Sequence, residues 1–230
     1  MTQSSNSRAA SREAQDRNEQ ALLSAVIQRI GNPPWDLLVI GDGSGSGWNE
    51  ACGWACTLIS NHQQLRRFFY GAMDCGSINL AEAMPYLQSL TWYDVHHGKE
   101  RLKALGYLRV HILTDSQVTA NWGNQAMSGE YAEPPRKLLA FYAGIRELRR
   151  VGYHCTFHWA KRLTTELNWA ADLIAGLSRK EIIKAGNPAY VSGADHAARA
   201  ANALGNMVFY DPHTGDALNP YLLNPVNTMG

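Results

Sequence analysis

Two aspartates of this 230-residue chain stand directly after apolar runs, where their carboxylates are placed to do chemistry. Asp42 follows Leu37–Ile40, an apolar and partly β-branched run that is too short for a helix and is typical of a buried strand. Asp115 follows Tyr107–Leu113, in which apolar residues alternate. A carboxylate at the end of a buried strand must be solvated, paired or bound to a cation. The glycines after Asp42 remove side chains, so a ligand or a second strand can come close.

Two further acids lie in segments with helical spacing. Glu82 falls in the first turn of a helix predicted over residues 79–95, for which Asn79 is the expected N-cap. Asp172 lies among apolar residues of a helix predicted over residues 166–180, one turn after Asn168. Each acid alone has a plainer explanation: an acidic turn for Asp42, the helix dipole for Glu82, and an exposed surface position for Asp172.

The order of the elements brings Asp42 and Asp115 together. A strand, a helical crossover and a second strand favour a parallel pairing, which places both aspartates at the carboxyl edge of one sheet. Two carboxylates at adjacent strand ends repel each other unless a cation lies between them. Carboxylates supply hard oxygen ligands, which suit Mg²⁺ or Mn²⁺ better than zinc. The sequence therefore predicts a metal site at this edge.

The remaining pattern predicts how these residues are positioned. Short connections make the first three strands an antiparallel meander. A polar connection over residues 96–106 follows the first helix. The expected strands cover residues 37–42, 52–59, 65–72, 107–113 and 153–160, and the expected helices cover residues 79–95, 117–125, 136–151 and 166–180.

Both ends of the chain read as extensions of one central domain. Residues 1–35 form an N-terminal extension with a polar start and a short amphipathic helix that ends near Ile30, before Pro33 and Pro34. The main domain is expected over residues 36–180. Residues 181–230 form a C-terminal extension of unknown role, which includes one possible helix over residues 193–204.

Composition narrows the class of protein. With 45% apolar and 18% charged residues the chain is globular and can bury a full core. The four cysteines form no CxxC pair, no apolar run reaches the length of a membrane span, and no secretion signal is visible, so we expect a cytoplasmic protein with reduced thiols and no membrane association. Residues 131–184 carry ten Lys and Arg against five Asp and Glu, an excess that suits a polyanion or else a set of solvated helix faces.

Four short motifs, in order, resemble those of the ribonuclease H family of the type 1 kind. They are Asp42-Gly43-Ser44 with the downstream Gly53-Trp54-Ala55, Asn79-Leu80-Ala81-Glu82, Thr114-Asp115-Ser116-Gln117, and Asn168-Trp169-Ala170-Ala171-Asp172. Each motif alone is weak, but four in the right order at the right structural places are a strong signal. The likeness covers roughly residues 36–180.

The resemblance implies an α/β, ribonuclease H-like fold, with a five-stranded mixed sheet of order 3-2-1-4-5 flanked by helices. It also implies a monomeric endonuclease that uses two Mg²⁺ ions, or Mn²⁺ as a substitute, to hydrolyse the RNA strand of RNA–DNA hybrids. Asp42 would be the central bridging ligand, with Glu82, Asp115 and Asp172 as flanking ligands. The expected substrate contacts are Gly43, Ser44, Asn79, Gln117, Lys161, Arg162 and Asn168.

Three departures from the family pattern matter. The loop Lys161–Thr165 lacks the histidine that many members carry, and the nearest histidine, His158, lies on the fifth strand, where we expect a structural role. The connection Asn124–Pro135 is too short for the basic handle helix of some bacterial members. The two extensions match nothing familiar. Two alternatives remain open: a nuclease of this fold that acts on DNA, such as a resolvase, exonuclease or transposase-like enzyme, and a non-catalytic nucleic-acid-binding module.

Overall fold

A computed structural model describes residues 23–45, 48–61, 66–162, 165–186, 209–210 and 217–218. The elements with named bounds are, in chain order, β1 (Leu37–Ser44), β2 (Trp48–Ser60), β3 (Arg66–Ser77), α2 (Ile78–Tyr93), the π-helical turn η1 (Asp94–Gly98), α3 (Lys99–Leu105), β4 (Leu108–Thr114), α4 (Gln117–Ser128), the 3₁₀ turn η2 (Arg136–Leu138), α5 (Leu139–Arg150), β5 (Tyr153–Trp159), α6 (Glu166–Gly186), β6 (Phe209–Tyr210) and β7 (Ala217–Leu218). A further helix spans residues 23–30. No helix in this described part of the chain is both long and apolar enough to cross a membrane.

The central sheet has five strands in the order β3-β2-β1-β4-β5, which confirms the predicted topology. β1 to β3 form the antiparallel meander, and β1, β4 and β5 run parallel. The parallel register pairs Ile40 of β1 with Leu113 of β4. Asp42 and Asp115 each stand two residues beyond this pair in the chain. The pairing of the strands therefore brings the two aspartates to one edge.

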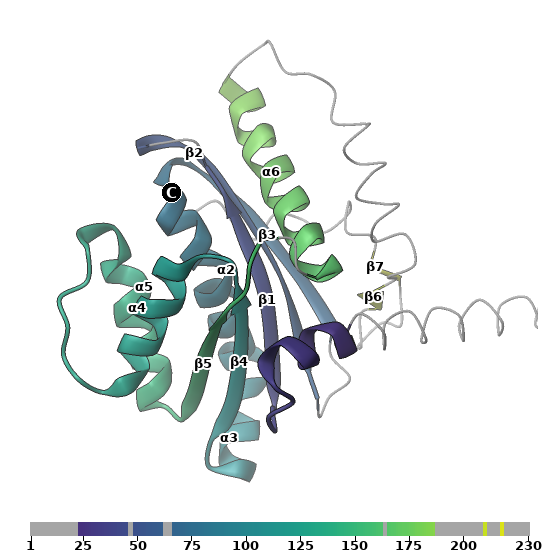
Figure 1. Cartoon of the computed structure of the whole chain (residues 1–230), viewed down its shortest axis with the longest axis vertical. Coiled ribbons are helices and arrows are strands. Elements are labelled where there is room, and N and C mark those ends of the chain that lie inside the picture. The colour runs from purple at the N-terminus through teal and green to yellow at the C-terminus, as the bar shows by residue number, and fades with distance from the viewer. Residues whose placement is uncertain are drawn as a thin grey trace, which may run out of the picture.

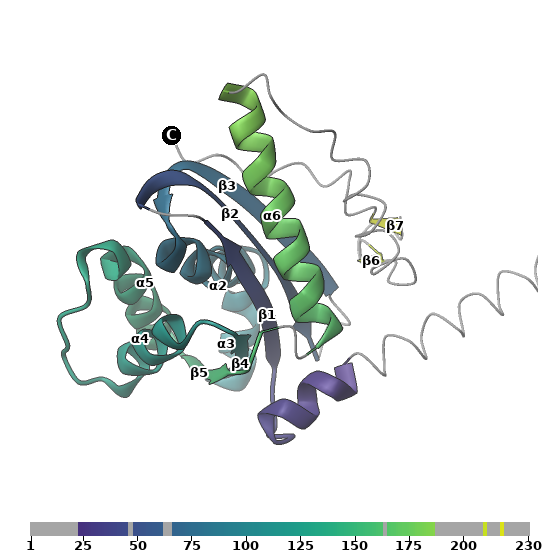
Figure 2. The same ribbon diagram turned by 45° about the horizontal axis from the view of Figure 1, so that its top comes forward.

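Helices cover both faces of the sheet and enclose two separate cores (Figures 1 and 2). On one face α2, α4 and α5 pack over a core that includes Leu37, Val39 and Ile112. On the other face α6 and the helix at residues 23–30 bury Leu38 and Ile40. Because adjacent residues of β1 feed opposite cores, both faces of this strand are buried, as its continuous apolar run predicted.

The helix at residues 23–30 belongs to the second core. Val26 is fully buried and Ile30 is 7% exposed, and both belong to the buried cluster that includes Leu38, Leu167 and Ile174. The extension predicted over residues 1–35 therefore contains a helix that is docked on the sheet. The suggested helix over residues 193–204 lies outside the described residues.

α6 crosses the sheet at a glycine of β2. A Cβ at Gly53 would overlap the backbone of Ala175 and of Arg179, so α6 can lie directly on β2 only where this side chain is absent. The Arg179 side chain then donates to the carbonyl of Ala51 at 2.8 Å. This close approach fixes the position of α6, which carries Asp172.

Three details of the helices differ from the sequence-based expectation. The N-cap of α2 is Ser77 rather than Asn79, because the Ser77 hydroxyl accepts the Leu80 amide at 3.3 Å. Glu82 consequently lies beyond the first turn of α2. The segment predicted as a polar connection over residues 96–106 is mostly helical, since η1 and α3 continue the chain from α2.

The π-helical turn η1 has a tertiary cause. Tyr153 of β5 places its hydroxyl against η1 and donates to an Asp94 carboxylate oxygen at 3.0 Å. A Cβ at Gly98 would overlap that hydroxyl. The helix therefore widens where a buried tyrosine from the distant strand enters.

Candidate active site

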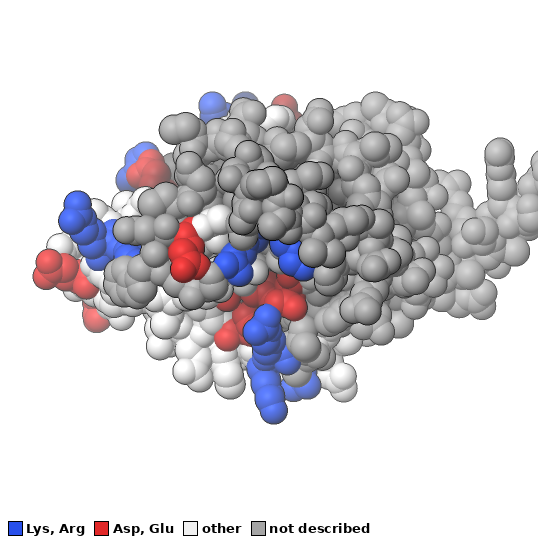
Figure 3. Space-filling model, turned by 90° about the horizontal axis from the view of Figure 1, so that it is seen from above, with Lys and Arg blue, Asp and Glu red and all other residues white. Residues whose placement is uncertain are grey.

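The carboxyl edge of the parallel strands holds three carboxylates from three different elements. Asp42 is on β1, Asp115 immediately follows β4, and Glu82 is on α2. Each offers an oxygen, and these atoms all lie within 4.8 Å of one another. Asp42 is only 3% exposed. Figure 3 looks down on the molecule and shows acidic side chains gathered near the middle of this face, with Lys and Arg side chains on either side.

Gly43 brings Glu82 close to the strand. A Cβ at Gly43 would overlap the backbone of Ala81 and Glu82, so the N-terminal part of α2 can pack against β1 only because residue 43 has no side chain. The Gly43 amide also donates to an Asp42 carboxylate oxygen at 2.7 Å. Gly43, predicted as a substrate contact, therefore acts on the geometry of the site through its backbone.

Burial and mutual repulsion make the three carboxylates hold protons more tightly than usual. Desolvation, followed by repulsion from Asp115 and Asp172, raises the pKa of Asp42 to about 7. Desolvation, followed by repulsion from Asp42, raises the pKa of Glu82 well above its ordinary range. Desolvation also raises the pKa of Asp115, although the nearby Arg162 guanidinium opposes the change. In the metal-free protein these groups are therefore destabilised in their charged form.

Asp172 lies at the margin of this group. It projects from α6, and its side chain is 26% exposed and forms an ion pair with Arg162. Its charge contributes to the raised pKa of both Asp42 and Asp115. The Arg162 guanidinium in turn has its pKa raised by Asp172 first, and also by Asp42 and Asp115. Arg162 therefore serves as an internal counter-cation at the site.

The donor set fits a divalent cation. The Oε2 atom of Glu82 is buried and has no hydrogen-bond partner, although a buried carboxylate oxygen without a partner is costly. The other two ligand candidates are also carboxylates, the donors that Mg²⁺ and Mn²⁺ prefer. A cation bound among them would satisfy the free oxygen and remove the repulsion.

Replacement of Arg162 by alanine is expected to tighten metal binding. The guanidinium competes with a cation for Asp172, and a partly exposed ion pair of this kind is worth about 1 kcal/mol, or about fivefold in affinity. Isothermal titration with Mn²⁺ would measure the dissociation constant for wild type and Arg162→Ala. Lys161→Ala, which removes the neighbouring positive charge, is the matched control. Unchanged or weaker binding in Arg162→Ala would show that Arg162 does not oppose the cation.

The other predicted contacts fall into two groups. Asn79, Gln117, Lys161 and Arg162 are exposed near the first turns of α2 and α4 or in the loop before α6, and Ser44 is half-buried at the end of β1. Asn168 is only 3% exposed, and its side-chain oxygen accepts from the Thr165 hydroxyl at 2.7 Å. The Thr165 hydroxyl also accepts the Asn168 amide at 3.2 Å. The Asn168 side chain is thus engaged at the start of α6 rather than directed to solvent.

His158 pairs with another histidine. Its Nε2 atom lies 2.8 Å from Nδ1 of His111 on β4, and the two rings are stacked. Partial burial lowers the pKa of both imidazoles, so the neutral forms are favoured. This arrangement accounts for His158 as a structural residue.

Two residues near the site were not identified from the sequence. Tyr86 is fully buried one turn after Glu82, and its hydroxyl lies 2.7 Å from the Gly41 carbonyl oxygen and 3.2 Å from the Leu113 carbonyl oxygen. It therefore joins β1 to β4 just below the two aspartates. Trp159, which is 51% exposed, donates its indole N–H to the Asp115 carbonyl at 2.9 Å. The i, i+4 spacing of Glu82 and Tyr86 is the one sequence signal that could have indicated the first of them.

Replacing Tyr86 with phenylalanine is expected to destabilise the fold by about 1–2 kcal/mol, because it leaves two buried carbonyl groups without this donor. Urea unfolding followed by circular dichroism measures the change. Tyr131→Phe removes a hydroxyl from a side chain that is 81% exposed and should leave stability unaltered. Equal stabilities for wild type and Tyr86→Phe would contradict the bridging role.

Comparison with known proteins supports the fold. No protein-family model and no curated protein sequence matches the chain. Among solved structures, LC11 ribonuclease H1 in complex with an RNA/DNA hybrid, an enzyme isolated from compost by a metagenomic approach, is 16% identical with a TM-score of 0.50, and the match covers 64% of this chain and 99% of that one. The N-terminal ribonuclease H domain of a Mycobacterium tuberculosis protein is 17% identical over 67% of this chain and 100% of that one, with a TM-score of 0.48. The ribonuclease H domain of prototype foamy virus is 16% identical over 65% of this chain and 97% of that one, with a TM-score of 0.45.

The strand order and the match to LC11 ribonuclease H1 define a ribonuclease H-like fold. The resemblance inferred from the four sequence motifs is thus confirmed at the level of the fold.

Proposed function

We propose that this protein is a metal-dependent endonuclease that hydrolyses the RNA strand of RNA–DNA hybrids. The observation that carries the proposal is the convergence of Asp42, Glu82 and Asp115 at the carboxyl edge of a ribonuclease H-like sheet. The hybrid-bound LC11 ribonuclease H1 is similar in fold and supports the choice of substrate. The excess of Lys and Arg in residues 131–184 suits a polyanionic substrate.

Each acid has a proposed role. Asp42 would be the central ligand, since it is the least exposed of the four acids and its strand β1 contacts the elements that carry or precede the other three. Glu82 and Asp115 would hold the cations beside it, and Asp172 would join them if its ion pair with Arg162 opened. Two bound divalent ions would activate the attacking water and stabilise the leaving oxygen. Glu82 also orients the 2′-hydroxyl, the group that distinguishes RNA from DNA.

The substrate contacts remain those predicted from the sequence. Ser44, Asn79 and Gln117 offer short polar side chains around the acids, and Gly43 and Asn168 help to shape the site. Lys161 and Arg162 would contact backbone phosphates, because both retain their positive charge near neutral pH.

The two alternatives make different demands on the site. A non-catalytic module does not need its acids to converge, whereas here the carboxylate oxygens lie within one cation's reach and one of them has no partner. A nuclease of this fold that acts on DNA would use the same acids, so only the choice of substrate separates it from the proposed enzyme.

The test is a cleavage assay on a DNA–RNA–DNA chimaera annealed to DNA, with a label at one end. The DNA flanks block exonucleases, so cuts inside the RNA segment show endonuclease action. We expect cleavage with Mg²⁺ or Mn²⁺, none with EDTA, and none of an all-DNA duplex of the same sequence. Cleavage of the DNA duplex alone would favour the DNA nuclease, and cleavage of neither substrate would favour the binding module. Asp42→Asn protein prepared in parallel controls for a contaminating nuclease.

A further inference from the structure

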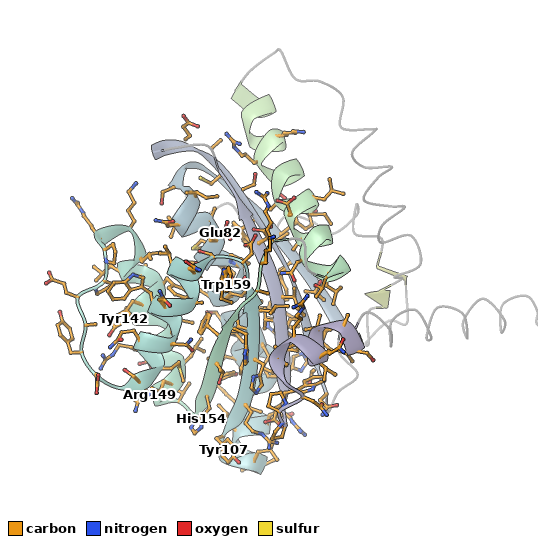
Figure 4. The ribbon with its side chains drawn as sticks, in the orientation of Figure 1. Glu82, Tyr107, Tyr142, Arg149, His154 and Trp159 are labelled. Carbon is orange, nitrogen blue, oxygen red and sulfur yellow. The ribbon has the colours of Figure 1, made fainter. Side chains whose placement is uncertain are left out.

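A second surface lies at the end of the sheet opposite the acids. It consists of Tyr107 and Arg109 at the start of β4, His154 at the start of β5, and Arg149 and Arg150 at the end of α5. We call it the aromatic–arginine surface. Figure 4 shows Arg149, His154 and Tyr107 in a row toward the lower end of the sheet, while Glu82 and Trp159 lie at the upper end.

The aromatic part of this surface is stacked and accessible. The Tyr107 and His154 rings are 5.1 Å apart at their centroids and inclined by 23°, and Tyr107 is 45% exposed. The Arg109 guanidinium lies 5.9 Å from the centre of the Tyr107 ring. Tyr107 and His154 are both exposed, and unpaired nucleic-acid bases stack on accessible aromatic side chains next to arginine.

The basic part borders a cavity. A cavity of about 660 Å³ is lined by Ala143, Arg146, Glu147, Arg149, Arg150 and His154, a set that contains three arginines and one acid. Arg150 is paired with Glu147, and Arg146 donates to the Glu130 carbonyl and contacts the Tyr142 hydroxyl. Arg149 forms no hydrogen bond or ion pair with any described residue, although it packs over Gly129 at the end of α4. Its charge is therefore available to an anion.

His154 joins the two parts, because it lines the cavity and also stacks on Tyr107. A ligand that suits both parts has a flat ring beside an anionic group. A nucleotide in a single strand has both, whereas the bases of a duplex are already stacked on each other and only its phosphates remain for the arginines.

We propose that the aromatic–arginine surface binds single-stranded nucleic acid, with a base on Tyr107 and His154 and a phosphate at Arg149. β4 has seven residues, so this surface lies roughly 20 Å from the acids at the other end of the strand. It is therefore separate from the proposed cleavage site and is suited to a single-stranded segment that flanks a bound hybrid.

Binding is tested without any need for cleavage. Fluorescence anisotropy of a labelled oligothymidylate of about 12 nucleotides, in EDTA and low salt, would give the dissociation constant for the full chain and its variants. We expect Tyr107→Ala and Arg149→Ala each to weaken binding at least about fivefold. The matched controls are Tyr131→Ala, which alters an exposed tyrosine, and Arg29→Ala, which alters an exposed arginine on the helix at residues 23–30. Both controls should bind within about twofold of wild type.

Each other outcome overturns the proposal. No binding of the oligonucleotide, equal losses in all four variants, or tighter binding of duplex than of single strand would each show that this surface does not recognise unpaired bases. Displacement of the oligonucleotide by thymidine monophosphate at a similar concentration would assign the cavity to a small nucleotide instead. Because Arg149 also packs on α4, its variant is read together with Tyr107→Ala, whose exposed side chain can be removed without disturbing a core. A protein that fails to cleave hybrid yet binds the oligonucleotide in this pattern would refute the proposed function and leave this inference intact.

Discussion

Asp42→Asn is expected to lower the rate of hybrid hydrolysis by about a thousandfold. Asp42 is the central member of the carboxylate group, and the loss of one charged ligand removes several kcal/mol of metal-assisted stabilisation of the transition state. Asp115→Asn should have a similar effect, since a carboxylate oxygen of Asp115 lies within 4.8 Å of one of Asp42. The measurement is kcat on the chimaeric hybrid at saturating Mg²⁺.

Glu133→Gln is the matched control for this prediction, because it neutralises an acid that is exposed in the loop before η2. Its rate should equal that of wild type. If Asp42→Asn kept more than about a tenth of the wild-type rate, the assignment of the metal site would be wrong, because such a loss corresponds to only about 1.4 kcal/mol.

The same Asp42→Asn substitution is expected to stabilise the metal-free protein at pH 8, by up to a few kcal/mol. Burial and neighbouring acids raise the pKa of Asp42 from 3.8 to about 7. Above pH 7 Asp42 is charged in both the folded and the unfolded state, but only in the folded state is the charge unfavourable, so its ionisation lowers the free energy of unfolding. Asparagine has nearly the same shape and carries no charge. A loss of activity together with a gain in stability is the mark of a site held in a repulsive arrangement.

This stability gain should shrink as the pH falls from about 8 to about 5. Between the unfolded pKa of 3.8 and the folded pKa of about 7, the folded state binds a proton that the unfolded state lacks, so acid stabilises wild type relative to the variant. His111 and His158 act in the opposite direction, since their lowered pKa makes folded protein lose stability as the pH falls through the imidazole range. Their contribution is common to both proteins and cancels in the difference.

Urea unfolding of wild type and Asp42→Asn in EDTA at several pH values tests this prediction. Saturating Mn²⁺ should remove or reverse the difference at pH 8, because a cation bound among the acids offsets their repulsion only while Asp42 is charged. If the difference in the free energy of unfolding between the two proteins did not vary with pH, the pKa of Asp42 in the folded protein would be close to its ordinary value. The repulsion between Asp42 and Asp115 would then be weak.

Two local errors in the sequence-based interpretation have physical reasons. Ser77 rather than Asn79 caps α2. Both are polar residues near the start of the helix, and the sequence alone does not say which side chain reaches a free backbone amide. The helical continuation through η1 and α3 was read as a polar connection, because its outward face is polar and the Tyr153 contact that shapes it comes from a distant strand.

The sequence by itself determined the order of the elements, the apolar run of β1 and the positions of the four acids in that order. Those features are local: strand and helix periods and short motifs can be read along the chain. From them follows the parallel pairing that brings Asp42 and Asp115 to one edge of the sheet. The full strand order came from the resemblance that the four motifs carry.

Only the tertiary structure decided how close the third and fourth acids come. Glu82 joins the group because α2 packs on the bare backbone of Gly43, whereas Asp172 stands at the margin because Arg162 already neutralises it. Tyr86 between β1 and β4, and the stacking of Tyr107 on His154, likewise join residues that are far apart in the chain. Such contacts depend on packing between elements. The i, i+4 spacing places Tyr86 on the same side of α2 as Glu82, but it does not identify the carbonyl groups that the Tyr86 hydroxyl meets.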